Sequence, residues 1–180
     1  VSGMERIPAG RSRACGLVAE TSPITIRSYQ PDDRDALVGL VRELQGHERV
    51  IEPLMIPEED IGLEYISRLE SRIKSYGGNI LIAADAGKPV GYAALYLNVP
   101  SDDEDEVPYN YALVADVAVT ASHRCKGLGK RLLTACEQAA REAGAERFRI
   151  FVLSQNHHAR TLYGAFGFQE RVTEMEKALK

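Results

Sequence analysis

The residues best suited to chemistry gather in one short segment, "SHRCKGLGKRLL", which runs from Ser122 to Leu133. Two glycines and a cluster of basic residues stand there between an apolar, strand-like run and a long helical pattern. Backbone N–H groups at the start of a helix can surround an anion, because glycines leave them open and the helix adds about half a positive charge. The segment therefore predicts an anion site. The alternative is a glycine-rich turn whose basic side chains are only solvated.

Two common phosphate-binding motifs do not fit this segment. A Walker loop needs a glycine five positions before its Gly-Lys pair and a Ser or Thr after it, and Arg124 and Arg131 stand in those places. A dinucleotide-binding fingerprint needs a third small residue where Leu132 stands. What remains is the pattern R-x-x-G-x-G, from Arg124 to Gly129, at the start of a helix.

A second set of residues follows one predicted strand later, as the pattern N-x-x-A-x-x-L-Y-x-x-x-G-F from Asn156 to Phe168. Taken in order, "DVAVTASHRCKGLGKRLL" and "NHHARTLYGAFGF" resemble the GCN5-related N-acetyltransferase (GNAT) superfamily. The resemblance covers roughly residues 24 to 168, and it is specific in the second half of the chain and only architectural in the first.

The resemblance implies acetyl-CoA as cosubstrate, with its pyrophosphate on the R-x-x-G-x-G loop. It also implies that the strands "DVAV" and "FRIFVL" splay apart, so that pantetheine can pair with an opened strand. A backbone N–H near Val117 or Ala118 would then polarise the thioester carbonyl. The residues expected to bind acetyl-CoA are Val117, Ala118, Val119, Arg124, Cys125, Lys126, Gly127, Leu128, Gly129, Lys130, Asn156 and Tyr163.

The implied reaction is the direct attack of a primary amine on the thioester. An amine with a pKa of about 10 must lose a proton before it attacks, and the departing thiolate can accept one. Tyr163 matches the general acid of the family. The alternative role for Tyr163 is packing of its helix onto the sheet.

The general base is less evident, because many relatives carry a Glu in the strand before the loop and this chain has Tyr111, Leu113 and Ala115 there. Asp116 is the only acid on that strand and is our candidate catalytic base. Strand alternation predicts its side chain on the face of Val114 and Ala118. The alternative is that Asp116 anchors a neighbouring loop.

Other residues are candidates for binding the acceptor. Glu43 and Glu48, predicted at the end of the first helix and in the loop after it, could hold a water that takes the proton. The acidic run 102–106 is either a solvated hairpin or a funnel for a cationic acceptor such as a polyamine, an aminoglycoside or a lysine-bearing peptide. Tyr109 and Tyr111 beside it could form an aromatic wall.

A sheet and helices must bring these residues together. Alternating apolar residues predict strands at 24–29, 79–85, 88–97, 109–119, 147–153 and 169–179. Helical spacing predicts helices at 31–45, 57–76, 128–144 and 156–168. Together with the resemblance, these strands and helices predict one domain of the α/β (α+β) class. Its central sheet is expected to be mixed and mostly antiparallel, with splayed central strands and flanking helices.

Length and composition bound the possibilities. The chain has 180 residues, 44% of them hydrophobic, which suits one domain at residues 23–180 preceded by a poorly ordered extension at 1–22. A net charge of −4 argues against a nucleic-acid binder, and no apolar run is long enough to cross a membrane. Three cysteines without paired metal spacing predict a reduced, cytoplasmic protein with no metal site.

The sequence therefore predicts an N-acetyltransferase that modifies the primary amine of a small molecule or peptide, with a homodimer as one possible assembly. The alternative is a non-catalytic sensor or interaction module that binds acyl-CoA with the same fold. A weaker third hypothesis is a nucleotide-binding α/β domain.

Overall fold

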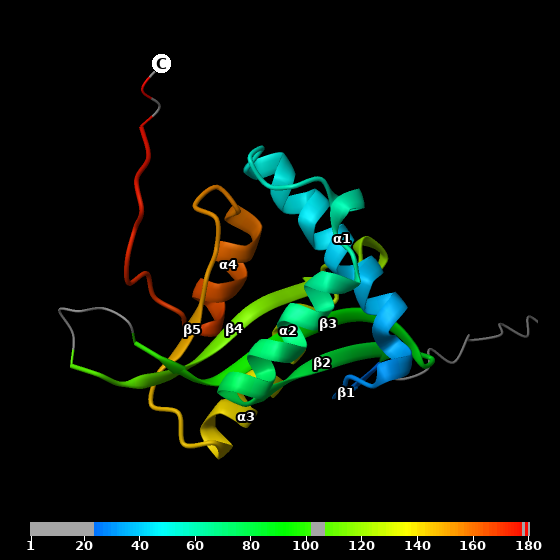
Figure 1. Cartoon of the computed structure of the whole chain (residues 1–180), viewed down its shortest axis with the longest axis horizontal. Helices are drawn as coiled ribbons and strands as arrows, with labels where there is room; N and C mark the ends of the chain where they lie inside the picture. Colours follow the sequence, from blue (N-terminus) through cyan, green and yellow to red (C-terminus); the bar gives the residue numbers. More distant parts are fainter. Residues whose placement is uncertain (1–23, 102–106, 178, 180) are drawn as a thin grey trace, which may run out of the picture.

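The computed structural model describes residues 24–101, 107–177 and 179. In chain order its elements are β1 (Thr25–Ser28), η1 (Pro31–Asp33), α1 (Arg34–Ile51), η2 (Glu58–Asp60), α2 (Leu63–Tyr76), β2 (Gly78–Asp85), β3 (Lys88–Pro100), β4 (Asn110–Val119), η3 (Ala121–His123), α3 (Leu128–Glu142), β5 (Phe148–Ile150) and α4 (His157–Phe166). Figure 1 shows them along the chain. The predicted extension at 1–22 and the acidic run 102–106 lie outside the described residues.

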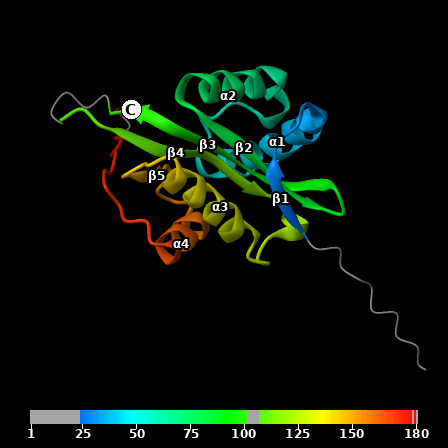
Figure 2. The ribbon, with the colours of Figure 1, turned by 90° about the horizontal axis from the view of Figure 1, so that it is seen from below.

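The strands form one sheet of five in the order β1-β2-β3-β4-β5. Neighbours from β1 to β4 are antiparallel, and β5 runs parallel to β4. Helices α1 and α2 cover one face and α3 and α4 the other, as Figure 2 shows. The prediction of a mixed, mostly antiparallel sheet flanked by helices is confirmed.

Apolar spacing explains how the helices attach to the sheet. In α1, Leu37, Leu40 and Val41 recur on one face and are buried. In α3 a stripe that includes Leu132 and Cys136 is buried in the same way. Each helix therefore buries one stripe against the sheet, which leaves the ends of the strands to shape the site.

The two predicted strands at 79–85 and 88–97 form a hairpin, β2 and β3, that turns at Ala86 and Gly87. Both residues have positive φ, 46° and 81°. Two consecutive residues of this kind suit the tight primed turns that match the twist of antiparallel strands. The hairpin fixes Asp85 at the start of the turn.

The structure corrects three element boundaries. Helix α1 continues to Ile51, so Glu48 lies within it and not in the loop that follows. The predicted helix at 57–76 is interrupted, because η2 ends at Asp60 and α2 begins only at Leu63. Gly62 between them has extended backbone. The last strand, β5, covers only three residues of the predicted run 147–153.

The strand predicted at 169–179 is wrong for the part of it that the structure describes, where no strand forms. Val172 and Met175 are 74% and 91% exposed. They stand three positions apart, so an extended chain points them to opposite sides. No single face of this segment is apolar enough to pack as a strand against the sheet.

Candidate functional site

Strands β4 and β5 pair over a short length and then separate. The ladder joins Ala112 to Phe148 and ends where Val114 faces Ile150. Beyond that point β4 continues to Val119, while the chain after β5 turns away. A cavity of about 1050 Å³ opens between them, lined by residues of β4, the segment after β5, α1, α3 and α4. The predicted splay of the central strands is confirmed.

The splay leaves one edge of β4 open to this cavity. Asp116 to Val119 pair with Ala94 to Gly91 of β3 on one side. Among the described residues, no strand pairs with them on the other side. The Val119 carbonyl accepts Arg124 Nε, and the other outward backbone N–H and C=O groups of this edge are available to a ligand that carries amides.

The start of α3 closes one end of the cavity. Gly127 caps the helix with a left-handed φ of 77°, and Cys125 shares that conformation with a φ of 59°. A Cβ added at Gly129 would stand 3.2 Å from Leu162 Cδ2, so this glycine lets α3 and α4 approach closely. The first N–H groups of α3 have no partner within the helix. Loop and helix start thus present backbone donors to an anion.

The basic side chains of the loop make contacts of their own. Arg124 Nε donates to the Val119 carbonyl at 2.9 Å, and Lys126 Nζ donates to the Ser122 carbonyl at 2.9 Å. Lys130 is exposed on the first turn of α3. All residues expected to bind acetyl-CoA line the cavity except Lys126.

A β-bulge turns Asp116 away from its expected face. The register of β4 against β3 shifts by one residue at Ala115, so that Ala94 faces Asp116 while Leu95 faces Val114. Val114 packs on the α3 side of the sheet, whereas Ala118 packs on the α1 and α2 side. Asp116 joins Ala118 and not Val114, because a bulge breaks the alternation on which the prediction relied.

Two tyrosines hold Asp116 on the α2 side. The Tyr65 hydroxyl lies 2.9 and 3.1 Å from its two carboxylate oxygens, and the Tyr92 hydroxyl donates to it at 3.2 Å. Burial raises the pKa of Asp116, and these two hydrogen bonds oppose the rise. Burial and the nearby carboxylate raise the pKa of Tyr65 in turn, so its hydroxyl keeps its proton.

Neither tyrosine was identified from the sequence, because Tyr65 and Tyr92 stand 51 and 24 positions from Asp116. No local motif joins them. The chain has eight tyrosines, and nothing in their spacing distinguishes these two.

Glu48 faces the same cavity from α1. Burial raises its pKa, and the negative charge of Asp116 raises it further. Among the described residues, no hydrogen bond or ion pair holds its carboxylate. Glu43, five residues earlier on the same helix, differs, because it pairs with Arg124 of the loop. The two glutamates that the sequence grouped together thus have separate surroundings.

Helix α4 contributes Tyr163 and Asn156. Burial, with smaller effects from Glu48 and Asp116, raises the pKa of Tyr163 to about 12. Asn156 is buried and its side-chain oxygen accepts the Ala159 N–H at 3.1 Å, which caps the helix. Both residues line the cavity, and the charge effects place Tyr163 in the same electrostatic environment as the two acids.

Tyr109 and Tyr111 do not line the cavity. They lie at the opposite end of β4, where the Arg149 guanidinium stands 4.0 Å from the Tyr111 ring centre and donates a hydrogen bond to the Tyr109 hydroxyl. Tyr111 is buried in the core. The structure therefore separates them from the other candidate residues, because β4 is ten residues long and its two ends serve different regions.

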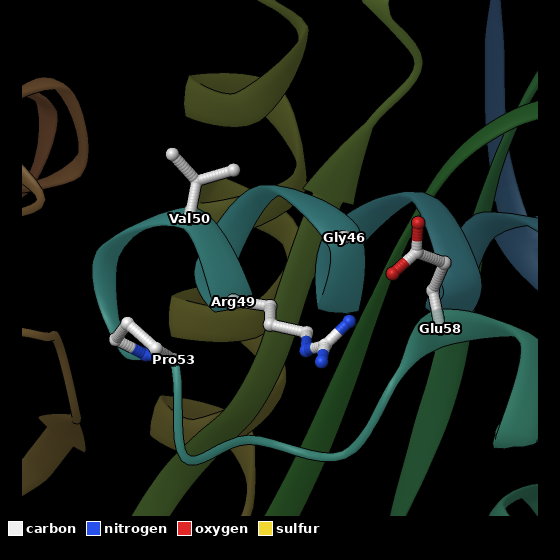
Figure 3. A pocket seen from close by; sticks show the side chains of 5 residues that line it. All are labelled: Gly46, Arg49, Val50, Pro53 and Glu58. Atoms are coloured by element: carbon white, nitrogen blue, oxygen red, sulfur yellow. The ribbon is translucent and has the colours of Figure 1, made fainter.

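A second hollow, of about 310 Å³, lies where α1 meets the loop after it. Figure 3 shows Arg49 and Glu58 reaching into it from α1 and η2. Arg49 Nε donates to the Met55 carbonyl at 3.2 Å, which ties the loop to the helix. The residues that line this hollow do not combine a nucleophile with a general acid and a general base, so it is not a candidate active site.

The residues that the structure describes contain neither a metal site nor a membrane-spanning helix. No three His, Cys, Asp or Glu side chains there are grouped as ligands for a metal ion. Neither does any helix in those ranges combine the length and apolar character needed to span a membrane.

Known N-acetyltransferases are similar to this chain in sequence. The profile of the acetyltransferase (GNAT) family matches residues 41–168. The uncharacterized N-acetyltransferase YycN of Bacillus subtilis is 38% identical over 76 residues, which are 42% of this chain and 49% of YycN. The match thus spans about half of that relative. The D-amino-acid N-acetyltransferase HPA3 of Saccharomyces cerevisiae is 25% identical over 140 residues, 78% of this chain and 81% of HPA3.

Solved structures share the fold. A mutant of the BH1408 protein of Bacillus halodurans superimposes with a TM-score of 0.73 at 18% identity, over 87% of this chain and 99% of that one. The aminoglycoside N-acetyltransferase AAC(6')-Iy, in complex with CoA, gives a TM-score of 0.67 at 20% identity, over 89% and 99%. At such identities the likeness establishes the architecture alone.

Proposed function

This chain belongs to the acetyltransferase (GNAT) family, and on that premise we propose that it transfers an acetyl group from acetyl-CoA to a primary amine by direct attack of the amine. The observation that carries the proposal is the opening of β4 beyond Val114, beside the R-x-x-G-x-G loop and in one cavity with Glu48 and Tyr163. An open strand edge, an anion-binding helix start and titratable groups are the parts that this reaction needs.

The residues present fit acetyl-CoA, which would supply an acetyl thioester with a thiolate leaving group. The backbone N–H groups around Gly127 and Gly129 suit its pyrophosphate, since Gly127 has open space around it. The edge from Val117 to Val119, which pairs with no strand among the described residues, suits the amides of pantetheine. An N–H group on this edge also suits the thioester oxygen.

We assign the removal of the amine proton to Glu48, directly or through a water. Its carboxylate faces the cavity without a hydrogen-bond partner among the described residues. Its raised pKa makes it a stronger base than an ordinary Glu once it is ionised. Asp116, fixed by two tyrosines, serves as the neighbouring negative charge that attracts an ammonium group and raises the pKa of Glu48.

We assign Tyr163 to the leaving group. With a pKa of about 12, against about 8.5 for a thiol, its hydroxyl transfers a proton to a thiolate unfavourably. It can still donate a hydrogen bond that stabilises the negative sulfur. Tyr163 thus acts as a hydrogen-bond donor more than as a full acid.

The acceptor binds on the α1 side of the cavity in this proposal. Leu40, Leu44 and Met55 supply an apolar wall there, and Glu48 supplies one free carboxylate. The names of HPA3 and AAC(6')-Iy refer to D-amino acids and aminoglycosides as acceptors. On this α1 side, one free carboxylate beside an apolar wall favours a compact monoamine over a polycation, while Glu174 of the C-terminal segment adds a second carboxylate elsewhere in the lining.

The test is thiol release from acetyl-CoA with a panel of amines: arylalkylamines, D- and L-amino acids, polyamines, aminoglycosides and a lysine peptide. Mass spectrometry then checks that the amine has gained one acetyl group. We expect amine-dependent release, highest for compact monoamines. Tight CoA binding with no release from any amine would instead favour the non-catalytic sensor.

A further inference from the structure

Glu43 of α1 reaches across to the loop that precedes α3. Its Oε1 accepts the Ala121 backbone N–H at 2.7 Å and lies 2.9 Å from Nη2 of Arg124. Ala121 is the first residue of η3, and Arg124 follows its last. One carboxylate oxygen therefore joins both ends of the short turn that leads into the R-x-x-G-x-G loop.

Arg124 is held on its other side as well. Its Nε donates to the carbonyl of Val119, the last residue of β4. The guanidinium thus connects three parts of the cavity wall, namely the end of β4, the loop and α1. With Nε and Nη2 engaged in these contacts, Arg124 braces the loop, and only Nη1 is left to join the backbone N–H groups at an anion.

We propose that Glu43 is a positioning residue for the acyl donor, which fixes the R-x-x-G-x-G loop through Ala121 and Arg124 so that its backbone donors face the cavity. The proposal rests on the proposed function for the identity of the donor. It also sets Glu43 apart from Glu48, although both lie on α1 and line one cavity.

The engaged state of Glu43 is the reason to separate it from acceptor binding. Its charge is paired with Arg124 at 2.9 Å, and the same oxygen already accepts a backbone donor. An ammonium group could reach Oε2 alone, and there it would meet a carboxylate whose charge Arg124 already balances. Glu48 carries no such contact among the described residues, so it is the better partner for the amine.

The test uses the full chain and CoA itself as the probe. We expect Glu43→Ala to raise the calorimetric Kd for CoA and the KM for acetyl-CoA about tenfold, with kcat and the acceptor KM nearly unchanged. Glu43→Gln keeps the shape and one acceptor oxygen, so it should lose about threefold. Asp35→Asn removes the same charge from an exposed position of α1 and should change nothing.

A double-mutant cycle tests whether Glu43 acts through Arg124. The variant with both Glu43→Ala and Arg124→Met should bind CoA within about twofold of Arg124→Met alone, because contacting residues are not additive. Unchanged CoA binding in both Glu43 variants would overturn the proposal, as would a rise in the acceptor KM alone. If Glu43→Ala does not fold, the Kd of Glu43→Gln for CoA decides between the two outcomes. A wild-type chain that does not bind CoA would instead refute the proposed function.

Discussion

The two sides of the cavity are built in different ways. The donor side consists of Val117 to Val119, the loop from Arg124 to Gly127 and the start of α3, and most of it is backbone. The acceptor side consists of Glu48 and the apolar wall on α1 together with Asp116, which Tyr65 holds from behind, and it is made of side chains. A backbone site depends on local conformation, whereas a side-chain site depends on contacts between distant elements. The two sides should therefore respond to different substitutions.

The largest effect on the acceptor side is expected from Glu48→Gln. Removing the general base should lower kcat/KM about 100-fold near neutral pH, while the Kd for CoA stays within about twofold. Only ionised Glu48 accepts a proton, so wild-type activity falls as pH drops through its raised pKa.

A pH–rate profile of kcat/KM checks this prediction. The limb that belongs to Glu48 should lie above the range of an ordinary Glu in the wild type and should be missing in Glu48→Gln. Asp35→Asn serves as the control on the same helix. Equal profiles for wild type and Glu48→Gln would remove Glu48 from the reaction.

A smaller effect is expected from Tyr163→Phe, at the boundary between the two sides. The change removes one hydrogen bond to the leaving sulfur and keeps the buried ring, so kcat should fall about tenfold. The loss should shrink for acyl donors whose thiols have a lower pKa, because these need less help. Steady-state kinetics with such donors measure the trend, and a turnover number equal to wild type would limit Tyr163 to packing.

The smallest effect is expected from Tyr65→Phe. Losing one of the two hydroxyls that hold Asp116 should reduce kcat/KM about threefold and leave CoA binding unchanged. Tyr29→Phe is the matched control, because its hydroxyl donates at 3.2 Å to Glu70, on α2 as well. Equal kinetics for the two variants would mean that Tyr65 has no part in orienting Asp116.

The same difference explains how much the sequence could predict. The donor side follows from neighbours in the chain: Gly127 must adopt a positive φ and Gly129 must admit Leu162, so glycine spacing signals both. The hydrophobic periods of α3, β2 and β3 are local too, and these elements lie close to their predicted positions, whereas α1 continues to Ile51 beyond its predicted end at residue 45.

The acceptor side could not be predicted from neighbouring residues in the chain. The bulge at Ala115 reverses which side chains of β4 point to each face of the sheet, and no residue type near it indicates a bulge. Tyr65 meets Asp116 only through the packing of α2 on the sheet. The pairing of Glu43 with Arg124 spans 81 positions, so no local pattern separates Glu43 from Glu48.

The central claim is that the open edge of β4 and the loop before α3 form the donor site, and a calorimetric titration with CoA tests it most directly. The wild type should bind one CoA per chain. Gly127→Trp should abolish binding. Gly144→Trp should not, although Gly144 has the same φ of 77° and equally open surroundings at the far end of α3. Equal CoA binding by both variants, or none by the wild type, would contradict the account.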